Sequence, residues 1–167
     1  MSKELVTKAK NGDVQALNKL IDNHKDLAFS IALKHLKNKE DAEDVVQNSF
    51  IIVLKSLKNF RNESKFSTWF YKIVYHECLK ELKLRKSELD NIVQSTKYDS
   101  DEDGILDKKI NFKEISKILK PNEYTVISLF YLQEKKISEI EKITSLSQSN
   151  IKVLLHRARN KMKEALK

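Results

Sequence analysis

The chain has 167 residues, is 40% hydrophobic and 34% charged, and carries a formal net charge of +8 with only two glycines and one proline. Scarce turn-forming residues beside abundant charges predict an all-α fold, in a chain long enough for one domain or two small ones. No run of about eighteen apolar residues occurs, and residues 1–10 lack the apolar stretch of a signal peptide. The sequence therefore predicts a cytoplasmic protein without membrane insertion.

Three helices are predicted in the first half of the chain. Apolar residues recur at three- and four-residue steps over 16–36, which predicts one long amphipathic helix entered at Asp13. A second helix follows Asn38 and continues to residue 57, with four acids in its first turns, where the helix dipole favours negative charge. A third helix is expected over 67–87.

The segment 89–108 differs from the rest of the chain in charge and pattern. It has a net charge of −4, whereas residues 1–88 carry +5 and residues 109–167 carry +7. It also loses helical periodicity and contains Gly104. We predict a flexible acidic linker that joins two small helical domains, and that acts either as a soluble tether or as a cover over a basic face.

The second half predicts four further helices. They are expected over 110–119, 121–133, 138–143 and 147–166. Pro121 suits the first turn of a helix, and Ser147 is a suitable N-cap for the last one. The short break at 144–146 gives the last two helices the spacing of a DNA-binding helix-turn-helix.

The final helix separates apolar and basic side chains on its surface. On a helical wheel, one arc is apolar: it consists of Ile151, Leu154, Leu155, Ala158, Met162, Ala165 and Leu166. Basic residues occupy both flanks: Lys152, His156, Arg159 and Lys163 on one, and Arg157 and Lys161 on the other. A solvated surface helix is the simpler explanation, but this many basic side chains favour nucleic acid.

Aromatic and basic residues alternate between Phe60 and Arg85. The wheel places Trp69 and Ile73 among cations, opposite an apolar arc that includes Phe70 and Val74. An aromatic ring in a cationic field is suited to stacking on an unpaired base. Packing of Trp69 under a neighbouring helix is an equally good explanation.

Catalytic and metal-binding patterns are missing from the sequence. The four histidines are scattered over separate predicted helices, and neither glycine belongs to a phosphate-binding loop. Cys78 has no partner thiol, so it is either a core residue or a redox sensor. We therefore predict no enzyme activity, no cofactor and no metal site.

Three motifs resemble those of one protein family. They are DAEDVVQ at 41–47, FRNESKFSTWFYKI at 60–73 and IKVLLHRAR at 151–159. With these motifs in this order and spacing, the chain resembles bacterial RNA polymerase sigma factors of the sigma-70 family, extracytoplasmic-function (ECF) group, from about Gly12 to Leu166.

The resemblance implies a specificity subunit that directs core RNA polymerase to promoter DNA and is itself controlled by an anti-sigma protein. Residues 1–88 would form a region 2-like domain that binds polymerase and recognises and melts the minus-10 element, and residues 109–167 a region 4-like domain for the minus-35 element. The implied polymerase contacts are Asp41, Asp44, Gln47 and Phe50. The implied minus-10 contacts are Arg61, Asn62, Glu63, Ser64, Lys65, Phe66, Trp69, Lys72, His76 and Lys80. The implied minus-35 contacts are Gln148, Asn150, Lys152, Val153, His156, Arg157, Arg159 and Lys163.

Some positions depart from the family pattern. Lys152-Val153-Leu154 replaces a frequent basic-Ser-Arg triplet, and His76 and Lys80 replace a frequent Asn and Asp, so the family does not predict the promoter sequence. Two alternatives stay open on the sequence alone. One is a stand-alone helix-turn-helix regulator, which would need a dimer interface that the sequence does not show. The other is a degenerate sigma-like adaptor that binds polymerase without reading DNA.

Overall fold

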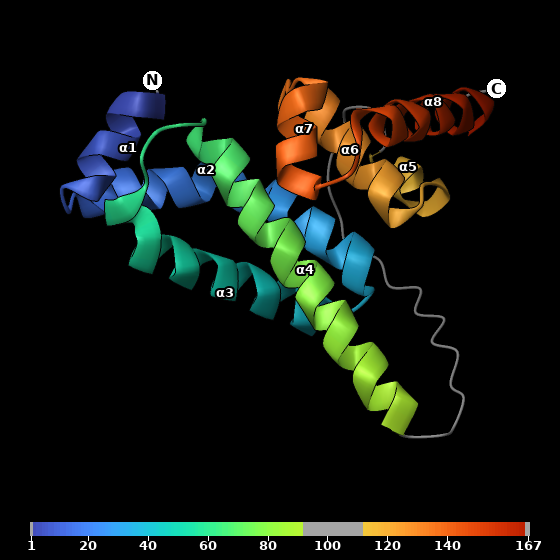
Figure 1. Cartoon of the computed structure of the whole chain (residues 1–167), viewed down its shortest axis with the longest axis horizontal. Coiled ribbons are helices and arrows are strands. Elements are labelled where there is room, and N and C mark those ends of the chain that lie inside the picture. The colour runs from blue at the N-terminus through green and yellow to red at the C-terminus, as the bar shows by residue number, and fades with distance from the viewer. Residues whose placement is uncertain (1, 92–111, 166–167) are drawn as a thin grey trace.

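The computed structural model describes residues 2–91 and 112–165, and its elements within these ranges are helices (Figure 1). They are α1 (Ser2–Lys10), α2 (Val14–Leu36), α3 (Lys39–Ser56), a 3-10 turn (Leu57–Asn59), α4 (Phe66–Asn91), α5 (Phe112–Ile118), α6 (Pro121–Tyr131), α7 (Ile137–Thr144) and α8 (Gln148–Ala165). The predicted all-α fold is confirmed. We call residues 2–91 the first lobe and residues 112–165 the second lobe.

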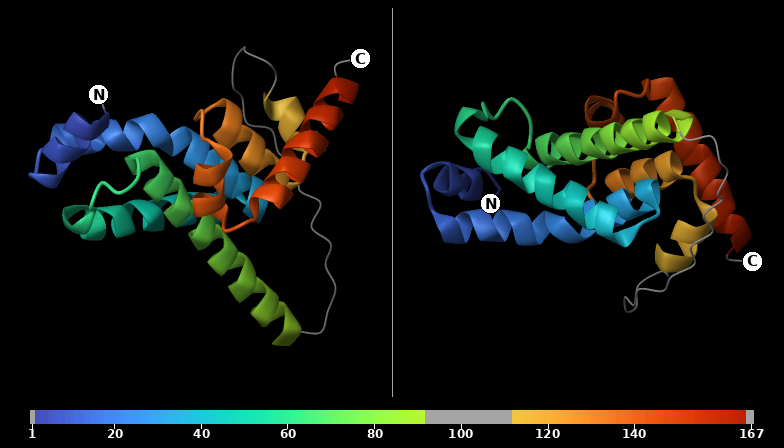
Figure 2. Two further views of the ribbon diagram at one scale, coloured as in Figure 1. Left: turned by 45° about the horizontal axis from the view of Figure 1, so that its top comes forward. Right: turned by 90° about the horizontal axis from the view of Figure 1, so that it is seen from below.

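In the first lobe, α4 crosses α2 and α3 and extends beyond them at its C-terminal end (Figures 1 and 2). Asp13 caps α2 by accepting a hydrogen bond from the Ala16 amide at 3.1 Å, and Asn38 caps α3 in the same way. Both starts agree with the sequence prediction. The centre of this lobe is fully buried and consists of Ala28, Ala32, Ala42, Phe70, Val74 and Cys78. The small alanines allow the helices to approach closely.

The first lobe differs from the sequence prediction in one additional helix and in the end of α4. Helix α1 was not predicted, because its nine residues are too few for a clear apolar period. Helix α4 continues through Asn91, so the linker predicted from residue 89 does not begin there. No proline or glycine stands between Ser87 and Asn91 to end the helix. Residues 92–108 of the predicted linker lie outside the described residues. The next described element is α5, which begins at Phe112.

The second lobe contains the predicted helix-turn-helix. Pro121 begins α6, where its missing N–H is not needed. Helix α7 is one residue longer at each end than expected, so the turn to α8 comprises 145–147 rather than 144–146. Ser145 adopts the left-handed conformation at φ 60° and ends α7. The Ser147 hydroxyl accepts from the Asn150 amide at 3.2 Å, which confirms the predicted cap of α8.

The two lobes are packed against each other. Helix α7 lies on α4, and α6 lies on α2. Figure 2 shows the same arrangement from two directions. Polar side chains make the described hydrogen bonds across this contact: Lys34 to the Ser116 carbonyl, His35 to Thr125, Tyr75 to Asn122, and Lys135 to Ser67 and Thr68.

The structure favours a core role for Cys78. Its side chain has no exposed surface, and burial raises the pKa of its thiol to about 12. A redox-sensing cysteine needs access and a thiolate, and this one has neither. Among the described residues, none of the helices combines the length and apolar character needed to cross a bilayer.

Candidate nucleic-acid interface

Helix α8 presents the predicted minus-35 residues to solvent. Ile151, Leu155 and Ala158 are buried against α6 and α7 and fix the orientation of the helix. Val153 is 45% exposed, which places the opposite face outward. The structure exposes all eight predicted contacts: Gln148, Asn150, Lys152, Val153, His156, Arg157, Arg159 and Lys163.

Several of these side chains have partners within the second lobe. The Gln148 amide donates to Glu141 at 2.8 Å, and Arg159 Nε donates to the Tyr131 hydroxyl at 2.8 Å. Lys161 differs from its neighbours because its ammonium lies 2.7 Å from Glu123, a carboxylate that is only 2% exposed. Of the two residues predicted for this basic flank, Arg157 is exposed, whereas Lys161 pairs with Glu123 and joins α8 to α6.

The loop before α4 carries half of the predicted minus-10 residues. Arg61, Asn62, Glu63 and Lys65 are exposed, and Ser64 is half-buried. Asn62 has a positive φ of 57°, a conformation that asparagine tolerates better than most residues. The Lys10 ammonium donates to the carbonyl of Phe60 at 2.6 Å. That bond ties α1 to the start of the loop.

Trp69 packs on aromatic residues at the ends of this loop and also retains a solvent-facing surface. Its ring stacks on Phe60 with centroids 4.7 Å apart, and it meets Phe66 in a T-shaped contact at 5.9 Å. Phe66 itself is only 5% exposed. Trp69 is half-buried, so it packs against the residues at the ends of the loop and keeps part of its surface in contact with solvent.

A pocket of about 410 Å³ adjoins the same loop. Its walls come from α1, α2 and the start of α4, and the lining residues are Glu4, Leu5, Lys8, Lys19, Leu20, Asn23, His24, Lys65, Phe66 and Ser67. His24 accepts or donates one hydrogen bond with the Tyr71 hydroxyl at 3.1 Å, and burial lowers its pKa to about 4. The imidazole is therefore neutral at pH 7. Lys19 and Asn23 were not predicted as site residues, because only the fold brings them beside the loop.

Farther along α4, one face is basic. Lys72, His76 and Lys80 are exposed there, as predicted, and Lys83 continues the row. Ile73 on this face is half-buried. Lys72 lies three residues after Trp69, so the basic row of α4 begins within one helical turn of that ring.

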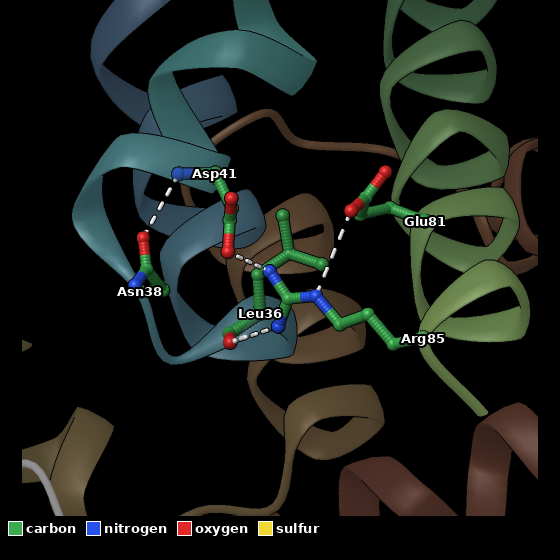
Figure 3. A network of polar contacts seen from close by, with 5 residues as sticks. All are labelled: Leu36, Asn38, Asp41, Glu81 and Arg85. Atoms are coloured by element: carbon green, nitrogen blue, oxygen red, sulfur yellow. Dashed lines mark hydrogen bonds and ion pairs between the residues drawn. The ribbon is translucent and has the colours of Figure 1, made fainter. Parts of the chain in front are cut away.

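The acids predicted to bind polymerase have different environments. Asp44 and Gln47 are exposed on α3, whereas Phe50 is half-buried and stacks on Phe70 with centroids 4.9 Å apart. The Asp41 carboxylate is bound by Arg85, which also donates to the Leu36 carbonyl and pairs with Glu81 (Figure 3).

The Arg85 network joins the start of α3 to the end of α2 and to α4 (Figure 3). Asp41 accordingly has an internal structural partner that the sequence did not reveal, since Arg85 lies 44 residues away. Within the described residues, Asp44 forms no ion pair or side-chain hydrogen bond and is the freer carboxylate.

Two apolar residues on α3 are exposed to solvent. Ile51 is 46% exposed and Leu54 is 50% exposed. At 100° per residue they share a face with Asp44 and Gln47. A wheel of this helix would have separated them from buried Val53. A shallow groove of about 300 Å³ between α2 and α3 adjoins this face, with Phe29, Val46 and Phe50 among its lining residues.

Both lobes match models of one protein family. The model described as Sigma-70 region 2 matches residues 20–88, and the model described as Sigma-70, region 4 matches residues 112–162. RNA polymerase sigma factor YlaC of Bacillus subtilis (strain 168) is 30% identical, with 75% of this chain and 77% of the relative covered. The ECF RNA polymerase sigma factor SigW of the same organism is 29% identical, with 100% and 97% covered.

The chain belongs to the sigma-70 family, in its extracytoplasmic-function group. This sigma factor directs RNA polymerase to promoters for transcription initiation. The two alternatives, a stand-alone regulator and an adaptor that does not read DNA, are not favoured, because both lobes match sigma regions and the relatives are sigma factors.

Solved structures share the fold of this sigma factor at low sequence identity. The structure of CnrH in complex with the cytosolic domain of CnrY matches with a TM-score of 0.62 and 19% identity, over 99% of this chain and 96% of that one. The sigma factor RpoE in complex with the anti-sigma factor NepR, from Bartonella quintana, matches with a TM-score of 0.67 and 20% identity, over 89% and 95%.

Proposed function

We propose that this sigma factor divides promoter recognition between its lobes. The loop 61–66 and the basic face of α4 would bind the minus-10 element, α8 would bind the minus-35 element, and the exposed face of α3 would bind core polymerase. The division follows the predicted domains 1–88 and 109–167. The observation that carries it is the outward orientation of α8, whose eight predicted contacts are exposed while its apolar arc is buried.

The minus-35 assignment rests on the geometry of the helix-turn-helix. Residues near the start of a recognition helix meet base edges in the major groove, and Lys152 and Val153 lie in the first two turns of α8. Lysine suits guanine, and valine suits the methyl group of thymine. Arg157, on the other flank, suits a backbone phosphate.

The pocket beside the loop supports capture of an unpaired base. Phe66 supplies an aromatic surface, Lys19 and Lys65 supply positive charge, and Asn23 supplies an amide that can pair with a base edge. We expect Asn23→Ala to slow promoter opening, measured by permanganate footprinting. On a promoter with an abasic site at the captured position, wild type and variant should open equally slowly. A defect of Asn23→Ala that persists on the abasic promoter would contradict a base-binding role.

The polymerase surface is assigned to Asp44, Gln47, Ile51 and Leu54. Exposed apolar residues beside polar ones are typical of a protein-binding face. Leu54→Asp should raise the Kd for core polymerase at least tenfold. Leu84→Asp is the matched control, because Leu84 is 52% exposed on α4, away from this face. Equal loss of binding in both variants, or in neither, would contradict the assignment.

The lobes must separate for both elements to be bound at once. The two elements are about 25 base pairs apart, which is roughly 85 Å of B-DNA. Laid end to end, α4 and α8 would span only about 65 Å, and in the structure the lobes are in contact. Free protein should therefore bind promoter DNA poorly, and core polymerase should supply the separation and the effective concentration.

Run-off transcription and gel shift with and without core polymerase test the whole proposal. The wild type should give promoter-specific product only with core polymerase. Charge reversal at Lys152 and Arg157 should abolish product from promoters that need a minus-35 element, whereas reversal of the exposed Lys117 on α5 should not. Tight, selective DNA binding by the isolated chain, or full activity of the reversed variant, would disprove it.

Regulation by an anti-sigma protein and action in the cytoplasm complete the proposal. Two proteins of the same fold are known in complexes: CnrH with the cytosolic domain of CnrY, and the sigma factor RpoE with the anti-sigma factor NepR. The chain would act as an initiation factor with no catalytic activity of its own. A cognate inhibitor should lower run-off transcription by the holoenzyme, and excess sigma factor should restore it. Failure of excess sigma factor to restore transcription would exclude inhibition of this kind.

A further inference from the structure

Arg159 on α8 is held by two aromatic residues at the end of α6. Its guanidinium carbon lies 5.5 Å from the ring centroid of Phe130 and 5.6 Å from that of Tyr131. Its Nε donates to the Tyr131 hydroxyl at 2.8 Å. The two rings meet each other in a T-shaped contact with centroids 5.1 Å apart. Tyr131 is also the last residue of α6, where the helix dipole attracts a cation. These contacts restrict the arginine from several sides.

The charge of Arg159 is not neutralised within the part of the chain that the structure describes. No carboxylate there forms an ion pair with it, and its side chain is exposed. Lys161, two residues later, shows the contrast, because its ammonium pairs with the buried Glu123 carboxylate. Lys161 therefore joins two helices, whereas Arg159 is fixed in place with its charge available to an anion.

The guanidinium also retains most of its hydrogen-bond donors. Its Nε–H is used by Tyr131, and within the described residues the four N–H groups of the two terminal nitrogens have no acceptor. A planar fork of this kind matches two oxygens of a phosphate. Because the rings already restrict the side chain, less conformational freedom is lost when the phosphate binds.

The position of Arg159 along α8 selects the backbone rather than the bases. It lies eleven residues after Gln148, about 16 Å along the helix axis. Residues that read base edges lie near the start of a recognition helix. We propose that Phe130 and Tyr131 are positioning residues that hold Arg159 for a phosphate of the DNA backbone at the minus-35 element. This inference rests on the proposed binding of that element by α8.

A double-mutant cycle on the holoenzyme tests the proposal. Arg159→Met should weaken promoter binding by about the same factor for all minus-35 sequences and lower the slope of log Kd against log salt by about 0.9, the value for one phosphate contact. Tyr131→Leu should weaken binding three- to tenfold, and Tyr131→Phe, which keeps the ring but loses the hydroxyl, should have a smaller effect. In the Arg159→Met background, Tyr131→Leu should have no further effect.

Controls separate this inference from the proposed function. Leu132→Ala changes the next residue, which is 47% exposed, and should leave affinity and salt slope unchanged. An equal loss from Tyr131→Leu with and without Arg159 would overturn the positioning role, although α8 would still bind the element. An unchanged affinity and slope in Arg159→Met, with Lys152→Met still defective, would also overturn it and leave minus-35 recognition intact. If Tyr131→Leu and Arg159→Met both unfold the second lobe, Tyr131→Phe is the deciding variant. Unchanged promoter affinity in Tyr131→Phe would overturn the role of the Tyr131 hydroxyl in positioning Arg159.

Discussion

The centre of the first lobe and the contact between the lobes bury different kinds of side chain. Phe70, Val74 and Cys78 are fully buried among apolar neighbours. Between the lobes, by contrast, an imidazole and an ammonium are buried: His35 is 7% exposed and Lys135 is 3% exposed. Both depend on hydroxyl partners, and the described hydrogen bonds across the contact join no opposite charges.

Burial of polar groups contributes less to stability than burial of apolar ones. A buried polar group loses its hydration, and its new hydrogen bonds return little beyond that loss. Burial lowers the pKa of Lys135, as expected for an ammonium without a carboxylate partner. We therefore expect the lobes to part more easily than either lobe unfolds, as binding to two separated promoter elements would require.

Removing a buried ring from the apolar core of the first lobe should lower stability more than any change at the lobe contact. Phe70→Ala removes a ring that has no exposed surface and stacks on Phe50. It should lower the free energy of unfolding by ~3–5 kcal/mol, measured by urea denaturation, because it leaves a cavity in the first lobe. A loss below ~1 kcal/mol would show that this core repacks easily, and the contrast with the lobe contact would then disappear.

Acid should weaken the contact between the lobes through His35. The Thr125 hydroxyl donates to the Pro121 carbonyl at 3.0 Å and so accepts from His35 Nε2 at 2.8 Å. Burial, with a smaller effect of neighbouring Lys34, lowers the pKa of His35 to about 4. The packed state thus binds fewer protons than the separated state, whose imidazole has an ordinary pKa near 6.5. The contact should be strongest above pH 6.5 and weaken as the pH falls towards 4, by at most ~1.4 kcal/mol per pH unit.

Fluorescence energy transfer measures this effect directly. Dyes on Lys58→Cys and Glu164→Cys, both exposed positions, report the distance between the lobes, and buried Cys78 stays unlabelled. His35→Gln keeps a donor for Thr125 but cannot titrate, so its transfer efficiency should not change between pH 7 and 5. The same acid response in wild type and His35→Gln would exclude His35 as its source.

Substitution of Lys135 tests whether the polar contact limits separation of the two lobes. Lys135→Met keeps the length of the side chain and removes the buried charge, so separation of the lobes should require ~1–3 kcal/mol more. Transfer between the same dyes should rise, and run-off transcription at limiting core polymerase should fall. Lys136→Met is the matched control, because Lys136 is the next residue and is exposed. A more open Lys135→Met would mean that its hydrogen bonds to Ser67 and Thr68 outweigh its desolvation.

Local sequence pattern predicted the helices from α2 to α8 and failed where distant contacts decide. Asp13, Asn38 and Ser147 are caps recognisable from the residues that follow them. The burial of Lys135 was not predictable, because two adjacent lysines indicate an exposed turn and its partner Ser67 lies 68 residues away. The exposed contacts of α8 followed from its wheel. Its aromatic support at Tyr131, 28 residues earlier, depends on how α6 packs on α8.

A substitution at Ser145 should change the stability of the second lobe only slightly and should not alter the contact between the lobes. Ser145 ends α7 at φ 60°, a conformation that disfavours residues with a Cβ by ~1–2 kcal/mol. Glycine lacks this penalty but loses ~0.5–1 kcal/mol more backbone entropy on folding. Ser145→Gly should therefore stabilise the second lobe by ~0.5–1 kcal/mol in urea denaturation. Ser138→Gly, inside α7, is the control and should destabilise it.

Energy transfer between the lobes should be the same in Ser145→Gly and wild type, because the polar groups at the contact are unchanged. If transfer rises together with stability, the second lobe and the contact respond as one unit. The contrast between an independently folded lobe and a separable contact would then fail, since any change that stabilised the helix-turn-helix would also hold the lobes together.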